Sequence, residues 1–240
     1  AILLRTKVHS PLSLRRLMVR PRYRDHKSTF ALILGNTLDQ RLVVTDMRET
    51  GGLVVVGGSN AKEHFMRAVL ITLLSMNTPG EMRLVLAGNN SEHYESLLNI
   101  PHAVRRLLKS PQDGQRLFLG LVKELERRLQ DFEAIGAENI GAYNATKIAQ
   151  EDEIIPHIVI VIDSLSDQMW QDARDAWLPL LTRILENQGR TGIYAIITSE
   201  SYEEPDLPES ISKLLSTQIV MRPSAGDIPQ SLENFHSSLL

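Results

Sequence analysis

The chain has 240 residues and a formal net charge of −3, with 42% hydrophobic and 23% charged residues. That composition excludes a disordered or collagen-like chain, and the length suits one α/β domain or two small ones. No apolar run approaches the roughly 20 residues that span a bilayer. The absence of cysteine excludes disulfides, thiol catalysis and cysteine-containing zinc sites.

The N-terminal segment differs in charge from the rest. Residues 1–27 carry eight basic residues and one acid, so the remaining 213 residues have a net charge of −10. A basic arm on an acidic body is typical of contact with nucleic acid or an acidic partner, and a solvated linker is the alternative. The first residue is not Met and residues 1–5 are too short for a secretory signal, so we expect a fragment of a longer protein.

Short apolar runs then alternate with helical patterns. Residues 30–34 and 41–44 flank a Gly-Asn-Thr turn and predict a β-hairpin. Continuous apolar runs are typical of strands buried on both faces. These runs cover residues 53–56, 83–87, 158–162 and 193–198, and residues 218–221 are typical of an edge strand.

Three helices are predicted between the strands, over residues 62–76, 118–132 and 178–188. Gly136 ends the second helix, and the third has Pro179 in its first turn and Gly189 past its end. Strand–helix alternation predicts an α/β fold in which helices cover both faces of a mostly parallel sheet. We therefore expect a basic arm or linker over residues 1–27 and one domain over residues 28–240.

In such a sheet, ligands bind beside the carboxyl ends of the strands. The run 53–56 is followed by a small polar loop and a lysine, the layout of a phosphate-binding loop of pattern G-x-x-x-x-G-K-[ST]. The candidate nucleotide-binding residues of this loop are Gly57, Gly58, Ser59, Asn60, Ala61 and Lys62.

Only Lys62 of this loop matches the pattern. Val56 and Ala61 stand at the glycine positions, and Glu63 replaces the hydroxyl that would hold Mg²⁺. Two like charges about 4 Å apart cost roughly 4 kcal/mol at an effective dielectric constant of about 20, so Glu63 opposes a bound phosphate. The loop therefore predicts weak triphosphate binding or none.

Several short stretches match the motor domain of one family in order and spacing. They are PLSLRRL at 11–17, FALILG at 30–35, IPH at 100–102, ERR at 126–128, YN at 143–144 and GRTGI at 189–193. Through most of its length the chain resembles the FtsK/SpoIIIE family of DNA translocases. The resemblance implies a RecA-like P-loop NTPase fold with an N-terminal hairpin, ATP and Mg²⁺ as cofactors, and hexameric rings around DNA.

The chain departs from that family at the loops that carry chemistry. The family's acidic pair after the third strand is Asp163-Ser164 here. The resemblance therefore adds Asp163 to the candidate nucleotide-binding residues, while a serine replaces the glutamate that orients the attacking water. Residues 88–90 and 198–202 also differ from the family's motifs. Since losing an orienting base typically lowers a rate 10²–10⁴-fold, we expect a pseudo-ATPase with no catalytic residue, cofactor or metal.

Two functions remain open. The first is a non-catalytic scaffold or regulatory module of a DNA-translocase or type VII secretion-like assembly, partnered by other FtsK-like subunits or domains. The second is an active ATP-dependent DNA translocase acting in chromosome segregation or DNA transfer. The resemblance implies a cytoplasmic location, with a parent protein that is membrane-anchored in many family members.

Other candidates carry less weight. No two of the histidines have metal-ligand spacing with a nearby acid, apart from the surface pair Glu92-His93. Trp170 and Trp177 are seven residues apart, which favours one face of a helix and core packing over a partner contact. Arg105, Arg106 and Lys109 form a basic cluster that could contact DNA, with an exposed helix face as the alternative.

Overall fold

A computed structural model of the chain provides the structure. It describes residues 12–37, 39–57, 59–88, 94, 97, 99–104, 110–201 and 206–221, without the side chains of residues 59–61. The cluster at residues 105–109, the pair at residues 92–93 and the tail after residue 221 lie outside the described residues.

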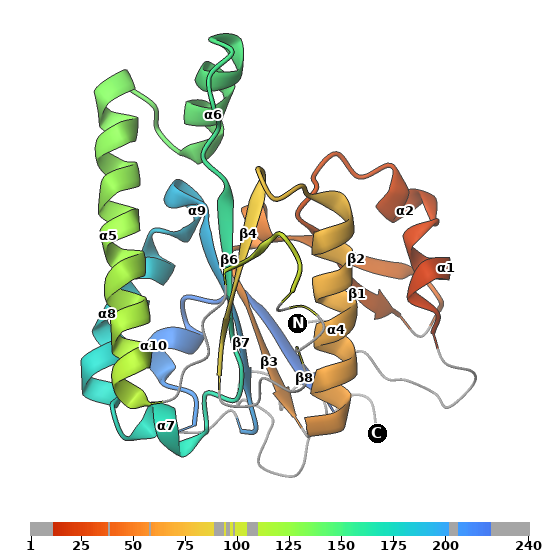
Figure 1. Cartoon of the computed structure of the whole chain (residues 1–240). Coiled ribbons are helices and arrows are strands. Elements are labelled where there is room, and N and C mark those ends of the chain that lie inside the picture. The colour runs from red at the N-terminus through yellow and green to blue at the C-terminus, as the bar shows by residue number, and fades with distance from the viewer. Residues whose placement is uncertain are drawn as a thin grey trace.

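A six-stranded sheet forms the centre of the molecule (Figure 1). Its order is β5-β4-β6-β7-β3-β8, and all neighbouring strands are parallel. The strands are β3 Leu53–Gly57, β4 Met82–Ala87, β5 Ala103–Val104, β6 His157–Ile162, β7 Ile193–Ser199 and β8 Thr217–Met221. The five predicted strands are confirmed, and β8 lies at an edge as expected. β5 was not predicted, because two residues are too few for a sequence pattern.

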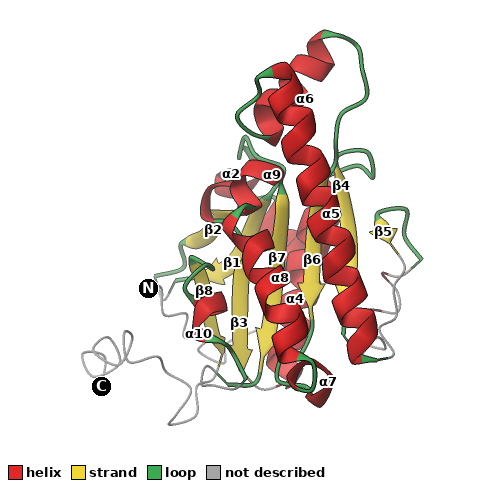
Figure 2. Cartoon of the chain, turned by 90° about the vertical axis from the view of Figure 1, so that its left-hand side faces the viewer, coloured by secondary structure: helices red, strands yellow, loops and turns green. Residues whose placement is uncertain are grey.

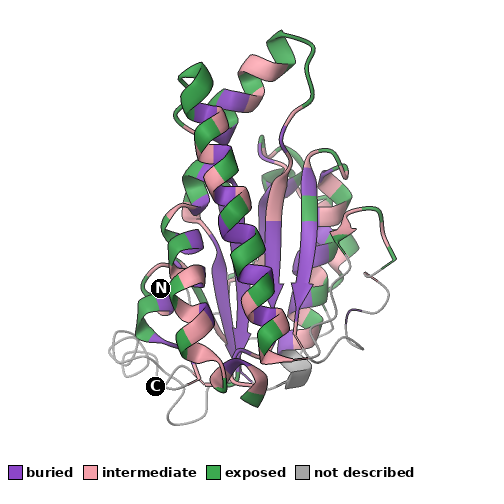
Figure 3. Ribbon diagram, turned by 60° about the vertical axis from the view of Figure 1, so that its left-hand side comes forward, coloured by how far each residue is buried: buried purple, intermediate pink, exposed green. Residues whose placement is uncertain are grey.

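Helices cover both faces of this sheet (Figures 1 and 2). One face carries α4 Ser59–Met76, and the other carries α5 Pro111–Ile135, α8 Arg174–Glu186 and α10 Glu209–Ser212. Successive residues of β3 point to opposite faces: Leu53 and Val55 pack with α4, whereas Val54 and Val56 pack with α5 and α8. The strands β3, β4, β6 and β7 are therefore largely buried on both sides (Figure 3), as their continuous apolar runs predicted.

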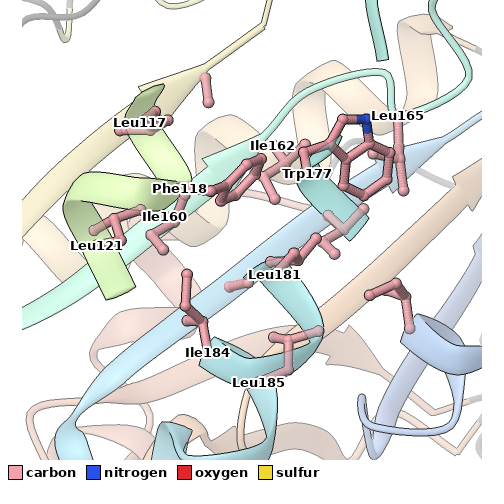
Figure 4. Close-up of a cluster of buried hydrophobic side chains, with 14 of the residues drawn as sticks. Leu117, Phe118, Leu121, Ile160, Ile162, Leu165, Trp177, Leu181, Ile184 and Leu185 are labelled. Carbon is pink, nitrogen blue, oxygen red and sulfur yellow. The ribbon is translucent and has the colours of Figure 1, made fainter. Parts of the chain in front are cut away.

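The core on the α5 and α8 face is built from aliphatic and aromatic side chains (Figure 4). Phe118 of α5 contacts Trp177 of α8 with ring centroids 6.1 Å apart. Trp170 and Trp177 are both buried, which confirms core packing, and they meet edge to face. They do not share one helix, because Trp170 belongs to the short helix α7 Gln168–Gln171.

The predicted hairpin is confirmed as a separate two-stranded antiparallel sheet of β1 Ala31–Asn36 and β2 Leu42–Asp46. The short helices α1 Leu14–Met18 and α2 Pro21–Arg24 precede it, and α3 Met47–Thr50 follows it. Leu17 of α1 and Tyr23 of α2 are buried in one apolar cluster with residues of the hairpin. The described part of the basic segment therefore packs on the hairpin.

The third predicted helix has different bounds. α8 begins at Arg174, so Pro179 lies inside the helix and not in its first turn. Trp177, which precedes the exposed proline, is buried, so the apolar face of the helix begins before Pro179. A separate turn, α9 Gln188–Thr191, follows α8, and it ends at Gly192 with φ +72°, so Gly192 is the helix stop and Gly189 is not.

A helical protrusion extends beyond the sheet at the amino ends of the strands (Figures 1 and 2). It consists of the last turns of α5, the helix α6 Ile140–Ala149 and the acidic loop at residues 151–153. Phe132, Ile140, Tyr143 and Ile155 form a small apolar cluster at its base. No helix among the described residues combines the length and the apolarity required to cross a bilayer.

Candidate nucleotide site

The candidate site lies at the carboxyl edge of the sheet, where β3, β6 and β7 end side by side. α4 starts at Ser59, three residues earlier than predicted, so Lys62 is the fourth residue of the helix and does not open it. Serine and asparagine favour helix N-termini, which accounts for the earlier start. In sequence, only Gly58 separates β3 from α4, and Gly58 lies outside the described residues.

Gly57 is fixed by the neighbouring edge strand. Its φ is +142°, and a Cβ at this position would lie 2.3 Å from the carbonyl oxygen of Met221 in β8. Both the backbone conformation and this close approach therefore require glycine. The structure thus explains Gly57 by strand packing, independently of any ligand.

Lys62 turns inward from α4 to the end of β7. The side chain is buried, with 5% of the residue exposed, and Nζ donates a hydrogen bond to the carbonyl oxygen of Ser199 at 3.0 Å. Burial lowers the pKa of this ammonium group, while the negative charges of Glu200, Asp163 and Asp167 oppose that shift. Lys62 is therefore the counter-charge of three carboxylates at this edge.

Asp163 follows β6 and is also buried. Its Oδ1 accepts a hydrogen bond from Thr198 Oγ1 at 2.7 Å and one from Tyr94 Oη at 3.5 Å. Thr198 Oγ1 in turn accepts the backbone N–H of Ser164 at 2.8 Å. Asp163 therefore links the end of β6 to the neighbouring strand β7 and to Tyr94.

The turn after Asp163 is tightly packed. Ser164 has a φ of +51°, and Trp170 Nε1 donates to the backbone carbonyl of Asp163 at 3.4 Å. A Cβ on Gly88, after β4, would lie 3.0 Å from Cβ of Asp163. Burial, followed by the charges of Asp163 and Glu200, raises the pKa of Asp167 in the same turn. The segment leaves little freedom for rearrangement around a ligand.

Glu63, at the hydroxyl position of the phosphate-loop pattern, forms an ion pair with Arg67 one turn later in α4, with 2.7 Å between Oε1 and Nη2. Its charge also raises the pKa of Tyr94, after the larger effects of burial and of Asp163. The Glu63 side chain therefore lies on the side of α4 that is turned toward Tyr94 and Asp163. In the phosphate-loop pattern, a hydroxyl that binds Mg²⁺ would stand at this position.

The structure brings Lys62 and Asp163 to the same edge of the sheet, although β7 lies between β3, which precedes Lys62, and β6, which precedes Asp163. Two residues that hold them, Thr198 and Tyr94, were not predicted as site residues. Thr198 lies near the end of β7, beside the end of β6 that precedes Asp163. Its position at the carboxyl end of a strand could therefore have predicted it as a site residue. Tyr94 lies in a stretch of sequence without a helix, strand or motif pattern. Nothing is described for the side chains of Ser59, Asn60 and Ala61.

Two of the histidines contact groups of the protein itself. His102 Nε2 lies 2.7 Å from the backbone carbonyl oxygen of Asn77, and His157 stacks on Tyr194 with ring centroids 5.8 Å apart. Within the described ranges, no group of three or more acidic, histidine or cysteine side chains is arranged to hold a metal ion.

Comparison with known proteins decides the family. The model of the FtsK/SpoIIIE family matches residues 13–219. The chain belongs to the FtsK/SpoIIIE family. The DNA translocase FtsK of Helicobacter pylori is 23% identical over 215 residues, which cover 86% of this chain and 25% of that protein. The FtsK of Pseudomonas aeruginosa is 25% identical over 228 residues, covering 85% of this chain and 28% of that protein. The chain thus spans about a quarter of these relatives.

Solved structures of the family share the fold. The cytoplasmic domain of EssC superimposes with a TM-score of 0.69 at 19% identity, covering 79% of this chain and 36% of that one. The cytoplasmic domain of the type VII secretion ATPase EccC of Thermomonospora curvata gives 0.67 at 19% identity, over 81% of this chain and 23% of that one. The RecA-like P-loop fold predicted for this FtsK/SpoIIIE member is therefore confirmed.

Proposed function

We propose that this chain is a non-catalytic member of the FtsK/SpoIIIE family, a scaffold or regulatory module of a DNA-translocase or type VII secretion-like assembly. The observation that carries the proposal is the position of Lys62. The ammonium group that would neutralise a nucleotide phosphate is buried, donates to Ser199 and is surrounded by carboxylates. A polyphosphate would have to displace these internal partners and approach the same negative charges.

The short connection between β3 and α4 supports the proposal. The G-x-x-x-x-G-K-[ST] pattern uses four residues between its glycines, and their N–H groups surround the phosphates. Here one residue separates the strand from the helix. The backbone at this position therefore offers few N–H groups outside the helix to a phosphate.

ATP and Mg²⁺ fit the residues present poorly. A carboxylate, Glu63, stands where a hydroxyl ligand of Mg²⁺ is expected, and it is already paired with Arg67. Ser164 stands where the water-orienting glutamate is expected, and its positive φ places it in a packed turn. A serine lacks the charge and reach of that glutamate, so we assign no catalytic role to any residue of this site.

An active ATP-dependent DNA translocase is the alternative, and it is favoured by the name of the relatives, DNA translocase FtsK. It would require Lys62 to leave Ser199 and a residue outside the expected motifs to activate water. The negative charge of the body also opposes a phosphate backbone. We therefore place this function second.

Three further parts of the proposal are taken from the family. Other FtsK-like subunits or domains are the proposed partners, and a DNA contact of the basic N-terminal segment belongs to the alternative function. The structures of EssC and EccC are of cytoplasmic domains, which supports a cytoplasmic location. The division into residues 1–27 and 28–240 also stays a proposal.

The melting temperature with and without millimolar ATP and Mg²⁺ tests this function, on the wild type and on Lys62→Ala. A micromolar Kd at millimolar ATP would stabilise the fold by about 4 kcal/mol, which is readily seen. We expect no ATP-induced shift in either protein. A shift in the wild type that Lys62→Ala abolishes would show that the site holds nucleotide and would overturn the proposal.

A further inference from the structure

The surface of the two N-terminal helices is basic and partly apolar. Residues 14–24 contain five arginines and no acid. Arg15, Arg16 and Arg22 are exposed, and within the described part of the chain they have no ion-pair or hydrogen-bond partner. Val19 lies between them with 63% of its surface exposed. We call Arg15, Arg16, Val19 and Arg22 the basic face.

The protrusion of α5 and α6 has the opposite charge. Residues 131–153, which we call the acidic tip, contain six acids against one lysine, and that lysine pairs with Asp152. Glu133, Glu138, Glu151 and Glu153 are exposed and have no cationic partner among the residues described. Ile148, on the same protrusion, is 65% exposed.

The basic face and the acidic tip of one folded copy cannot contact each other, so their charges cannot pair within that copy. α6 and α2 lie apart in both Figure 1 and Figure 2, and the tip is anchored to α5 by the apolar cluster at its base. Each surface combines unpaired charges with exposed aliphatic side chains, Val19 on the basic face and Ile135 and Ile148 on the acidic tip. Arginine around an apolar centre is a typical composition of protein interfaces.

We propose that the acidic tip of one copy docks on the basic face of a second copy. In this arrangement Glu151 and Glu153 meet Arg15 and Arg16, and the exposed aliphatic side chains are covered at the same time. Because each copy contributes a different surface, the contact is heterologous and joins copies head to tail, in a ring if the rotation between neighbours closes and in an open chain if it does not.

A nucleic acid explains these surfaces less completely. Phosphates would pair with the arginines of the basic face, but they would repel the acidic tip and leave Ile148 without a partner. The only aromatic residue of the two helices, Tyr23, is buried, so no ring is available for base stacking. Only the complementary tip accounts for both surfaces.

This inference deepens the proposed scaffold function by naming the partner and its contact surfaces. The two can still fail separately, because neither surface includes the candidate nucleotide site. The test described next uses no nucleotide, and an ATP-induced melting shift would overturn the first proposal without touching the second.

Sedimentation velocity on the full chain tests the contact, at about 50 mM and about 500 mM salt, where screening differs strongly. Two variants reverse one surface each: Arg15→Glu with Arg16→Glu, and Glu151→Arg with Glu153→Arg. A third variant carries all four changes. Arg116→Glu with Lys123→Glu, exposed on the other half of α5, is the control with the same charge change as the first.

The wild type and the control should associate at low salt and dissociate at high salt. Each single-surface reversal should weaken self-association by about tenfold or more, and an equimolar mixture of the two reversals should associate again, because opposite charges then face each other. The four-change variant should recover most of the wild-type association.

Three outcomes would overturn the proposal. One is a wild type that stays monomeric at about 200 µM in low salt, a concentration at which even a weak contact is populated. Another is association that the reversals do not affect. The third is a basic-face reversal that abolishes binding of a duplex DNA oligonucleotide while the tip reversal changes nothing, which would identify DNA as the partner of the basic face.

Discussion

At the scale of single residues, the burial of His157 should make the free energy of unfolding depend on pH. Its ring packs against both Phe30 and Tyr194, with centroids 4.6 Å and 5.8 Å away. Burial, with smaller effects of Arg128 and Arg48, lowers its pKa from 6.5 to about 4. The unfolded chain therefore binds more protons than the folded chain between these pH values, and the free energy of unfolding should rise by about 3 kcal/mol from pH 4 to pH 6.5.

Urea unfolding of the wild type and of His157→Phe between pH 4 and 8 checks this prediction. The phenylalanine keeps the ring contacts and removes the titrating group, so the slope below pH 6.5 should decrease in the variant and stay unchanged above it. Tyr194→Phe, which retains the stacked ring, should keep the wild-type slope. Equal slopes in His157→Phe and the wild type would rule out the assigned role.

The candidate site shows which residues a sequence pattern can locate. Lys62 was predicted because a strand, a small polar loop and a lysine form the layout of a phosphate-binding loop, and Asp163 because the resembled family has an acidic pair at that position. The residues that form hydrogen bonds with Lys62 and Asp163 were not predicted. The bond from Lys62 to Ser199 depends on a backbone carbonyl, and Tyr94 depends on a loop conformation. Such contacts leave no periodic signal.

At the scale of elements, Arg128 joins three segments that the sequence does not connect. Its guanidinium is 1% exposed and donates to the backbone carbonyls of Thr191 and Pro156, both at 2.7 Å, and to Glu124 at 2.8 Å. Arg128→Met would keep most of the volume and leave two buried carbonyls without a donor. We expect a loss of about 2–4 kcal/mol in unfolding free energy.

The neighbouring Arg127 provides the matched control. Its side chain is 51% exposed and pairs with Glu124 and Asp131 on the helix surface. Because exposed pairs contribute little, Arg127→Met should lower stability by less than about 0.5 kcal/mol. Denaturant titration compares the unfolding free energies of the two variants. Equal losses of unfolding free energy would contradict a specific stabilising role for the hydrogen bonds of Arg128.

A second pair of variants tests the stop of α9. Gly192 has a φ of +72°, and a Cβ there would lie 2.7 Å from His157 Nδ1 and Ile140 Cδ1, whereas a Cβ on Gly189 meets nothing within 4 Å. Gly192→Ala should therefore lower the melting temperature by several degrees, which corresponds to about 1–3 kcal/mol. Gly189→Ala should be neutral or slightly stabilising, since alanine favours a helix. The prediction fails if both changes have the same effect.

The elements themselves were predictable to different degrees. Buried parallel strands consist of continuous apolar runs, so β3, β4, β6 and β7 were located within one or two residues. The start of α8 was misplaced because Pro179 was taken as a helix N-terminus signal, although an exposed proline inside a helix is tolerated at a cost in local bonding. The stop of the following turn was assigned to Gly189, because two glycines lie close together and only packing distinguishes them.

At the scale of the whole molecule, the sequence predicted the layers and the family but not the order of the strands. Strand order depends on which crossover packs beside which strand, and helix periodicity carries no such information. The protrusion was also not predicted, since the helical pattern of α5 continues without a break from the segment that covers the sheet into the segment that leaves it.

We propose that Lys62, which stands at the lysine position of the phosphate-loop pattern, stabilises the fold and does not hold a ligand. The unfolding free energy of Lys62→Met without nucleotide tests this claim most directly. Removing the ammonium leaves the Ser199 carbonyl and three carboxylates without their buried cation, so we expect a loss of about 1–3 kcal/mol at pH 7. A variant as stable as the wild type, or more stable, would mean that Lys62 is kept for a ligand, and the scaffold account would be wrong.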